Sequence, residues 1–221
     1  MPLIELTGPP CSGKSTALPA LLSQFKGVHL DDAWVDKQIG ISRWPVLIRF
    51  VVREVFLNLR GSTLLGIGRM RLLILAVSQS GWRLQRQINV IRNVVTKFAL
   101  HELAYKSSEK NLILDEGVFH LPFVFATSRV HCPKEVFAFF PFGYPRVVCI
   151  YSEHKTLEER LLSRGHSMLG SNSTEETLCR FVEANIAAQV FQQSFLASIP
   201  EISKVNLSSQ RFNTHNASEF K

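Results

Sequence analysis

The sequence of 221 residues lacks the features of several protein classes. Its four cysteines lie far apart and form no Cys-x-x-Cys pair, so we expect neither a zinc site nor a disulfide framework. Although the formal net charge is +7, the chain has no run of lysines and arginines. A compact anionic ligand therefore fits the charge better than a nucleic acid does. The chain also contains no internal repeat and no low-complexity tract.

We expect no signal peptide, and the chain has no uninterrupted apolar stretch of the ~20 residues that a membrane span needs. Its most apolar part, residues 44–77, is interrupted by five arginines: Arg49, Arg53, Arg60, Arg69 and Arg71. We therefore expect a buried or amphipathic helix here and no membrane span. These absences predict a cytoplasmic protein.

Five short apolar runs alternate with segments of helical spacing. We predict strands at residues 3–6, 27–30, 111–114, 146–151 and 204–207. The alternation predicts an α/β fold of three layers, α/β/α, with a parallel sheet of about five strands. We expect one domain over residues 1–207, followed by a polar tail over residues 208–221.

A long helical insertion follows the second predicted strand. It covers about residues 44–107, and turn signals at residues 60–62 and 80–82 predict about three helices within it. The next segment, residues 118–144, is rich in phenylalanine and proline. Its aromatic side chains suit a core and a contact surface equally well.

A phosphate-binding motif follows the first predicted strand. Residues 8–15 read Gly-Pro-Pro-Cys-Ser-Gly-Lys-Ser, which fits G-x-x-x-x-G-K-[ST]. Backbone amides and the start of the next helix would hold a polyphosphate, with Lys14 on its β- and γ-phosphates and the Ser15 hydroxyl on Mg²⁺. The motif thus predicts ATP and Mg²⁺ as cofactors, bound by Gly8, Pro9, Pro10, Cys11, Ser12, Gly13, Lys14, Ser15 and Thr16.

Carboxylates follow the second and third predicted strands. Asp115 ends the third strand, where an acidic residue commonly holds Mg²⁺. Its neighbour Glu116 has three open roles: polarising a water, orienting a substrate hydroxyl, or lying solvated. We expect Asp31 and Asp32 to lie beside the phosphate loop, where one accepts the proton of an acceptor hydroxyl and the other caps a helix.

Two arginines lie four residues apart on the helix that follows the fourth predicted strand. Arg160 and Arg164 share one face and lead into a polar loop, so we predict a lid over about residues 160–174. Arginines near transferring phosphates stabilise the developing charge. The alternative is a surface pairing with the adjacent Glu158 and Glu159.

Taken together, these motifs resemble the P-loop small-molecule kinases, a family that includes nucleoside, nucleotide, gluconate and adenylylsulfate kinases. The resemblance covers most of residues 1–207 in layout, and the phosphate loop is its one specific match. It implies that Arg160 and Arg164 belong to a lid over the triphosphate and that Asp31 or Asp32 is the acceptor-side acid. It also implies that the insertion shapes the acceptor pocket.

One departure from this family concerns the acceptor. Nucleotide kinases commonly carry an Asp-Arg or Glu-Arg pair after the third strand, where this chain has Glu116-Gly117. This favours a sugar, a sugar phosphate or another, less common, metabolite, and a nucleoside-like acceptor stays open. We expect the acceptor to be anionic. The hypothesis is an ATP-dependent phosphotransferase that moves the γ-phosphate to a hydroxyl or phosphate of a small molecule.

The alternative function is a P-loop NTPase that acts as a switch or remodels a partner, with Glu116 positioning water. The insertion would then dock on a protein or a membrane surface. The sequence leaves open a homodimer, the choice between ATP and GTP, and the identity of the acceptor.

Overall fold

The structure, a computed structural model, describes residues 3–128, 130, 133–164, 174–199 and 204–208. Its centre is one sheet in which every pairing is parallel and the strand order is β2-β3-β1-β4-β5. This confirms the predicted α/β class with a parallel sheet. The strands are β1 (Leu3–Thr7), β2 (Val28–His29), β3 (Leu112–Asp115), β4 (Arg146–Tyr151) and β5 (Lys204–Ser208).

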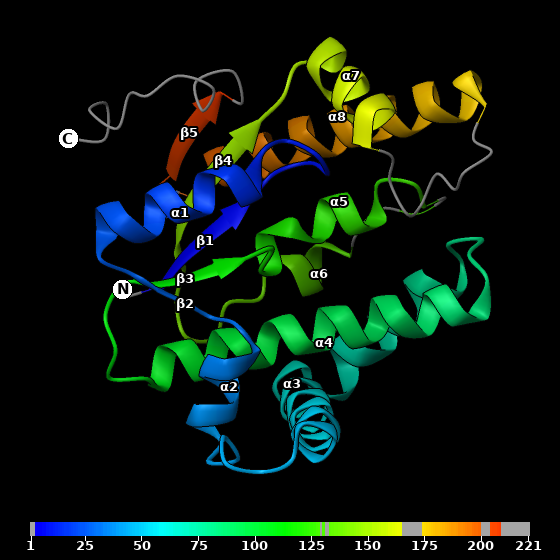
Figure 1. Cartoon of the computed structure of the whole chain (residues 1–221). Helices are drawn as coiled ribbons and strands as arrows, with labels where there is room; N and C mark the ends of the chain where they lie inside the picture. The colour runs from blue at the N-terminus through cyan, green and yellow to red at the C-terminus, as the bar shows by residue number, and fades with distance from the viewer. Residues whose placement is uncertain (1–2, 129, 131–132, 165–173, 200–203, 209–221) are drawn as a thin grey trace.

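Helices cover both faces of this sheet (Figure 1). Because side chains alternate along a strand, Ile4 and Leu6 of β1 face helix α1 (Lys14–Phe25), while Leu3 faces the opposite side. On that opposite side pack α4 (Leu84–Lys106), the short α5 (Leu121–Phe125) and the C-terminal α8 (Glu175–Ala197). The arrangement is compatible with the three-layer fold expected from the sequence.

The segment between β2 and β3 is helical, and its helices divide differently from the prediction. It contains α2 (Asp32–Gln38), α3 (Val46–Ser78) and α4. The turn expected at residues 80–82 is present, but α3 runs through residues 60–62 and is kinked at Gly66 instead. A Cβ on Gly61 would lie 2.0 Å from the backbone oxygen of Val95, so this glycine permits close helix packing rather than a turn.

Helix α3, with its kink at Gly66, thus covers the first and second of the three helices expected between residues 45 and 105, and α4 covers the third. In Figure 1, α3 lies at the outside of the molecule, against α4 and away from the sheet. The insertion therefore consists of an inner helix, which touches the sheet layer, and an outer helix.

The phenylalanine-rich segment belongs to the core. It contains the short helix η1 (Val118–His120), α5 and α6 (Lys134–Phe137). Phe119 and Phe137 are fully buried and meet edge to face, with their ring centroids 5.8 Å apart. Packing against α4 and α8, rather than contact with a partner, accounts for these aromatic residues.

The last part of the chain carries α7 (His154–Arg164) and α8. Thr174 caps α8 by accepting a hydrogen bond from the amide of Thr177 at 3.2 Å. Strand β5 extends one residue further than expected, to Ser208. Most of the predicted lid, residues 165–173, and most of the predicted tail, residues 209–221, lie outside the described residues.

Candidate functional site

The loop of residues 8–15 connects β1 to α1 and has a backbone that only glycine suits at its start. Gly8 has φ +153°, and a Cβ there would lie 2.3 Å from the backbone oxygen of Ile150 on β4. Gly13, just before α1, has φ +101°. Both glycines of the motif therefore occupy conformations that other residues rarely adopt.

The start of α1 presents free backbone donors. The first amides of any helix have no partner inside it, and no side chain caps this one. The first turn of α1 also contains no acidic residue, so its partial positive charge is not offset there. The loop and helix together form a surface that attracts an anion.

Lys14 is buried within this loop. Its Nζ donates hydrogen bonds to the backbone oxygens of Gly8, at 3.0 Å, and Pro9, at 2.9 Å. It also forms an ion pair with Glu116, whose Oε1 lies 3.2 Å away. The ammonium group thus bridges the loop and the end of β3.

The ends of β1 and β3 bring the two motifs of the sequence together. A cavity of about 370 Å³ lies between the loop and the residues after β3. Asp115 Oδ1 is buried and has no hydrogen-bond partner among the described residues. The cavity is lined by Pro10, Cys11, Gly13, Lys14, Ser15, Thr16, Asp115, Glu116, His120, Phe123 and Val124. The predicted Lys14, Ser15, Asp115 and Glu116 therefore share one site.

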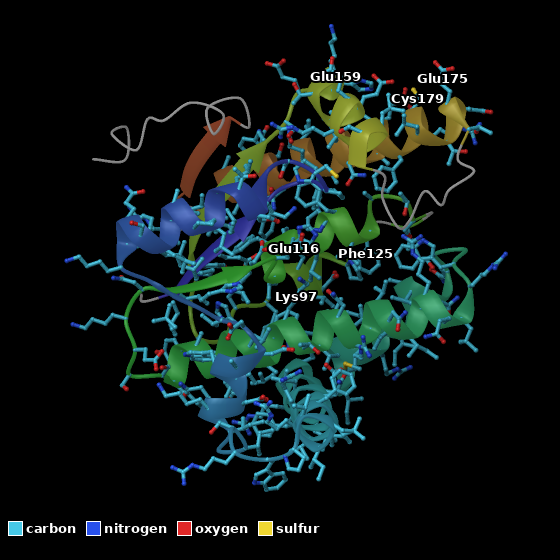
Figure 2. The ribbon with its side chains drawn as sticks, viewed as in Figure 1. Lys97, Glu116, Phe125, Glu159, Glu175 and Cys179 are labelled. Atoms are coloured by element: carbon cyan, nitrogen blue, oxygen red, sulfur yellow. The ribbon has the colours of Figure 1, made fainter. Side chains whose placement is uncertain are left out.

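Three buried polar residues near this cavity were not singled out from the sequence. Glu5 lies on β1 and accepts a hydrogen bond from the amide of Phe119 at 2.5 Å. Lys97 reaches from α4 toward Glu116, as Figure 2 shows. His120 lines the cavity and lies 3.6 Å from Glu116 Oε2. Of these three residues, only Glu5 could have been noticed from the sequence, because it is an acidic residue that interrupts the apolar run 3–6.

Glu5 also explains the glycine that departs from the nucleotide kinases. A Cβ on Gly117 would lie 2.4 Å from the carboxyl carbon of Glu5. The residue after Glu116 is therefore small because a buried carboxyl group occupies the neighbouring space.

Burial and charge shift the pKa values of these groups in different directions. Burial raises the pKa of Glu5 and lowers that of Lys97. Burial, reinforced by the adjacent Glu116, also raises the pKa of Asp115.

The pKa of Glu116 is shifted in the opposite direction to that of Asp115. Burial raises its pKa, but the nearby His120, Lys14 and Lys97 outweigh that effect and hold the pKa below its usual range. Burial lowers the pKa of His120 to about 3, so its ring is neutral near pH 7. The site therefore holds an ionised Glu116 beside Asp115, a carboxyl group whose pKa is raised.

Of the two predicted lid arginines, Arg160 lies at the loop. Its Nη1 donates to the backbone oxygens of Cys11, at 3.3 Å, and Ser12, at 3.0 Å. Arg164 ends α7, and its side chain lies outside the described residues.

Asp31 and Asp32 follow β2, which β3 separates from β1. Neither aspartate lines the cavity, and their expected place beside the acceptor stays a prediction. Asp31 caps α2 and accepts a hydrogen bond from the amide of Trp34 at 2.8 Å. This confirms the prediction that one of the two aspartates caps a helix. Asp32 is paired with Arg53 of α3, with a nitrogen-to-oxygen distance of 2.7 Å.

Comparison with known protein families and with characterised proteins gives no match to this chain.

Proposed function

We propose that the chain is a P-loop NTPase of the small-molecule kinase type, which binds ATP with Mg²⁺ at loop 8–15. In this proposal it transfers the γ-phosphate to a hydroxyl or phosphate of a small metabolite. The supporting observation is that the uncapped start of α1, Lys14 and the unpartnered carboxylate of Asp115 meet in one cavity. A helix start and a lysine attract polyphosphate, and a free carboxylate oxygen suits a hard cation.

The residues of the cavity fit a nucleotide-bound Mg²⁺. Asp115 and Ser15 both line it and offer a carboxylate and a hydroxyl oxygen. Mg²⁺ typically takes one or two protein ligands and completes its shell with water and phosphate oxygens. The described residues contain no group of three or more His, Cys, Asp and Glu side chains that could hold a metal, which suits such a sparse site. When bound, Mg²⁺ would neutralise charge on the β- and γ-phosphates.

Lys14 and Glu116 would change partners when a triphosphate binds. Lys14 now donates to two loop carbonyls and pairs with Glu116. A polyphosphate competes for this ammonium group and thereby frees the Glu116 carboxylate. Because Glu116 lines the cavity and stays ionised near pH 7, we assign it to accept a hydrogen bond from the acceptor hydroxyl. A catalytic role for Asp31 or Asp32 stays a prediction.

The remaining walls of the cavity bear on the acceptor and the lid. Phe123 and Val124 of α5 give it an apolar side, which suits the apolar face of a sugar ring. Arg160 already contacts the loop through Cys11 and Ser12, so a modest movement would bring it to the phosphates.

Nucleotide binding tests the loop. We expect Lys14→Ala to weaken ATP binding about 10-fold to 100-fold, because a charge-assisted hydrogen bond contributes about 1.5–3 kcal/mol. Isothermal titration calorimetry with ATP and Mg²⁺ would measure it. Lys37→Ala is the matched control, since Lys37 is an exposed lysine of α2 outside the cavity. Unchanged ATP affinity in Lys14→Ala would refute the proposed site.

A screen of hydroxyl metabolites with ATP and Mg²⁺ tests the reaction. ADP release that depends on the acceptor supports the kinase, and we expect Glu116→Gln to lower kcat more than it changes ATP affinity. ADP release without any acceptor would instead support the NTPase switch, the alternative function.

A further inference from the structure

The outer helix α3 exposes apolar side chains along its length. The exposed large residues include Leu47, Ile48, Val51, Val55, Leu59 and Ile67, which we call the α3 face. Residues 48, 51, 55 and 59 are spaced three or four apart and therefore lie on one side of the helix. The most apolar part of α3 has a mean hydropathy of 1.3 yet is only 22% buried. This is not the pattern of a core helix.

The segment that carries the α3 face is strongly cationic. Residues 39–106 contain eleven lysines and arginines but two glutamates, whereas the rest of the chain has more acidic than basic residues. Both glutamates are already paired, Glu54 with Arg92 and Glu102 with Arg60 and Lys106. The positive charge of the whole chain therefore resides in the insertion.

Several of these arginines remain available to an external anion. Arg49 and Arg53 are paired with Asp32 and Asp36 of α2. In contrast, Arg43, Arg71 and Arg83 are exposed and form no ion pair with a carboxylate among the described residues. Trp44 is half exposed just before α3 begins. Exposed apolar, cationic and tryptophan side chains thus occur together in one segment.

We propose that the α3 face docks this protein on the surface of an anionic membrane. The apolar side chains would enter the boundary between head groups and acyl chains, and the arginines would contact anionic head groups. A tryptophan at the helix end suits the same boundary. This inference does not depend on the reaction proposed for the cavity.

The structure argues for a helix that lies on the membrane rather than across it. The inner side of α3 packs closely on α4, since Gly61 meets the backbone of Val95. That side also carries Arg53, which is buried in its ion pairs with α2. A span would have to break these contacts and place charged groups in hydrocarbon.

A second copy of the chain is the competing occupant, and charge disfavours it. Two identical cationic segments facing each other would bring arginines together, while both glutamates of each segment are already paired. An anionic lipid surface instead provides the opposite charge over a wide area.

Co-sedimentation of the full chain with phosphatidylcholine vesicles, with or without phosphatidylglycerol, tests this proposal. We expect binding to the anionic vesicles that weakens with added salt. Val55→Glu should reduce the partition coefficient about tenfold or more, because a charge replaces an inserted apolar group. Val190→Glu on α8 is the matched control, since Val190 is 55% exposed and Val55 is 53% exposed. Circular dichroism would confirm that both variants fold.

A second variant separates the head-group contact from the apolar contact. Arg71→Ser with Arg83→Ser should weaken binding and reduce its salt dependence while leaving the α3 face intact. Absence of vesicle binding, equal binding to neutral vesicles, or equal losses in Val55→Glu and Val190→Glu would overturn the proposal. Light scattering supplies one more contrary outcome. The proposal would also be overturned if the wild type formed a dimer that Val55→Glu dissociates and did not bind the vesicles.

Discussion

The two glycines of the loop after β1 and two of the three glycines of the outer helix α3, Gly66 and Gly68, have opposite surroundings. Gly8 meets the backbone of Ile150, and Gly13 lies 3.5 Å, measured from its ideal Cβ, from Arg160 Nη1. By contrast, ideal Cβ atoms on Gly66 and Gly68 meet nothing within 4 Å. The loop is held in shape by β4 and α7, which lie far away in sequence, whereas the surface of α3 is open.

The same two regions also differ in which side chains they bury and which they expose. Around the cavity, Glu5, Lys14 and Lys97 are ionisable groups withdrawn from water. On α3, large apolar groups face water. Each region therefore departs from the usual distribution of residues, which marks both as surfaces shaped by something other than stability alone.

Loss of a buried charge near the cavity should have the largest effect. Lys97 on α4 interacts electrostatically with Glu5, Asp115 and Glu116, so Lys97→Met would leave Glu5 without this cation, while Lys14 still pairs with Glu116. Loss of the charge that compensates a buried group typically costs up to about 3–5 kcal/mol in the free energy of unfolding. Urea denaturation would measure this cost.

A double variant shows whether Glu5 is the group involved. Because Gln is neutral, Lys97→Met combined with Glu5→Gln should cost less than the sum of the two single changes. Lys155→Met is the control, an exposed lysine on α7 outside the cavity, expected to change stability by about 0.5 kcal/mol or less. Strictly additive effects of the first two changes would show that Lys97 and Glu5 act independently.

A structural feature could be predicted from the sequence where residues close to it in the chain determine it. The strands and the loop 8–15 depend on neighbouring residues, and their patterns predicted them. Gly61 looked like a turn because its role is to approach Val95, which lies on another helix. The exposure of α3 could not be predicted either, since the sequence pattern of an apolar helix is the same whether its side chains contact a core or water.

The candidate site was predictable to a similar extent. Lys14, Ser15, Asp115 and Glu116 follow strands and so meet at one edge of the sheet, as expected. Lys97 comes from the middle of a helix, where nothing in its neighbours distinguishes it from a solvated lysine.

Acid should destabilise the protein through α4, the helix between the two regions. Burial lowers the pKa of His101 to about 4, and its Nε2 has no partner among the described residues. In the unfolded chain a histidine has a pKa of about 6.5, so between about pH 6.5 and 4 the unfolded state binds the proton and the folded state does not. The free energy of unfolding should therefore fall by about 3 kcal/mol across this window.

His101→Leu should remove this part of the pH dependence while keeping an apolar contact with Phe140, whose ring centroid lies 5.5 Å from that of His101. Urea denaturation at several pH values would show the wild type and His101→Leu diverging as pH rises from 4 to 6.5. Parallel curves would mean that His101 is protonated in the folded state, contrary to its burial.

The smallest effects should come from the two open glycines of α3, and they should differ in sign. Gly66 has φ +67°, so a side chain there is strained, and Gly66→Ala should lower the free energy of unfolding by about 1 kcal/mol or more. Gly68 lies within the helix with no atom within 4 Å of an added Cβ, so Gly68→Ala should raise it by about 0.5–1 kcal/mol. Because the two sites have equal space, their difference measures backbone conformation alone. If both changes destabilised the protein equally, the surface of α3 would be less open than the structure shows, and the contrast with the enclosed loop at Gly8 would weaken.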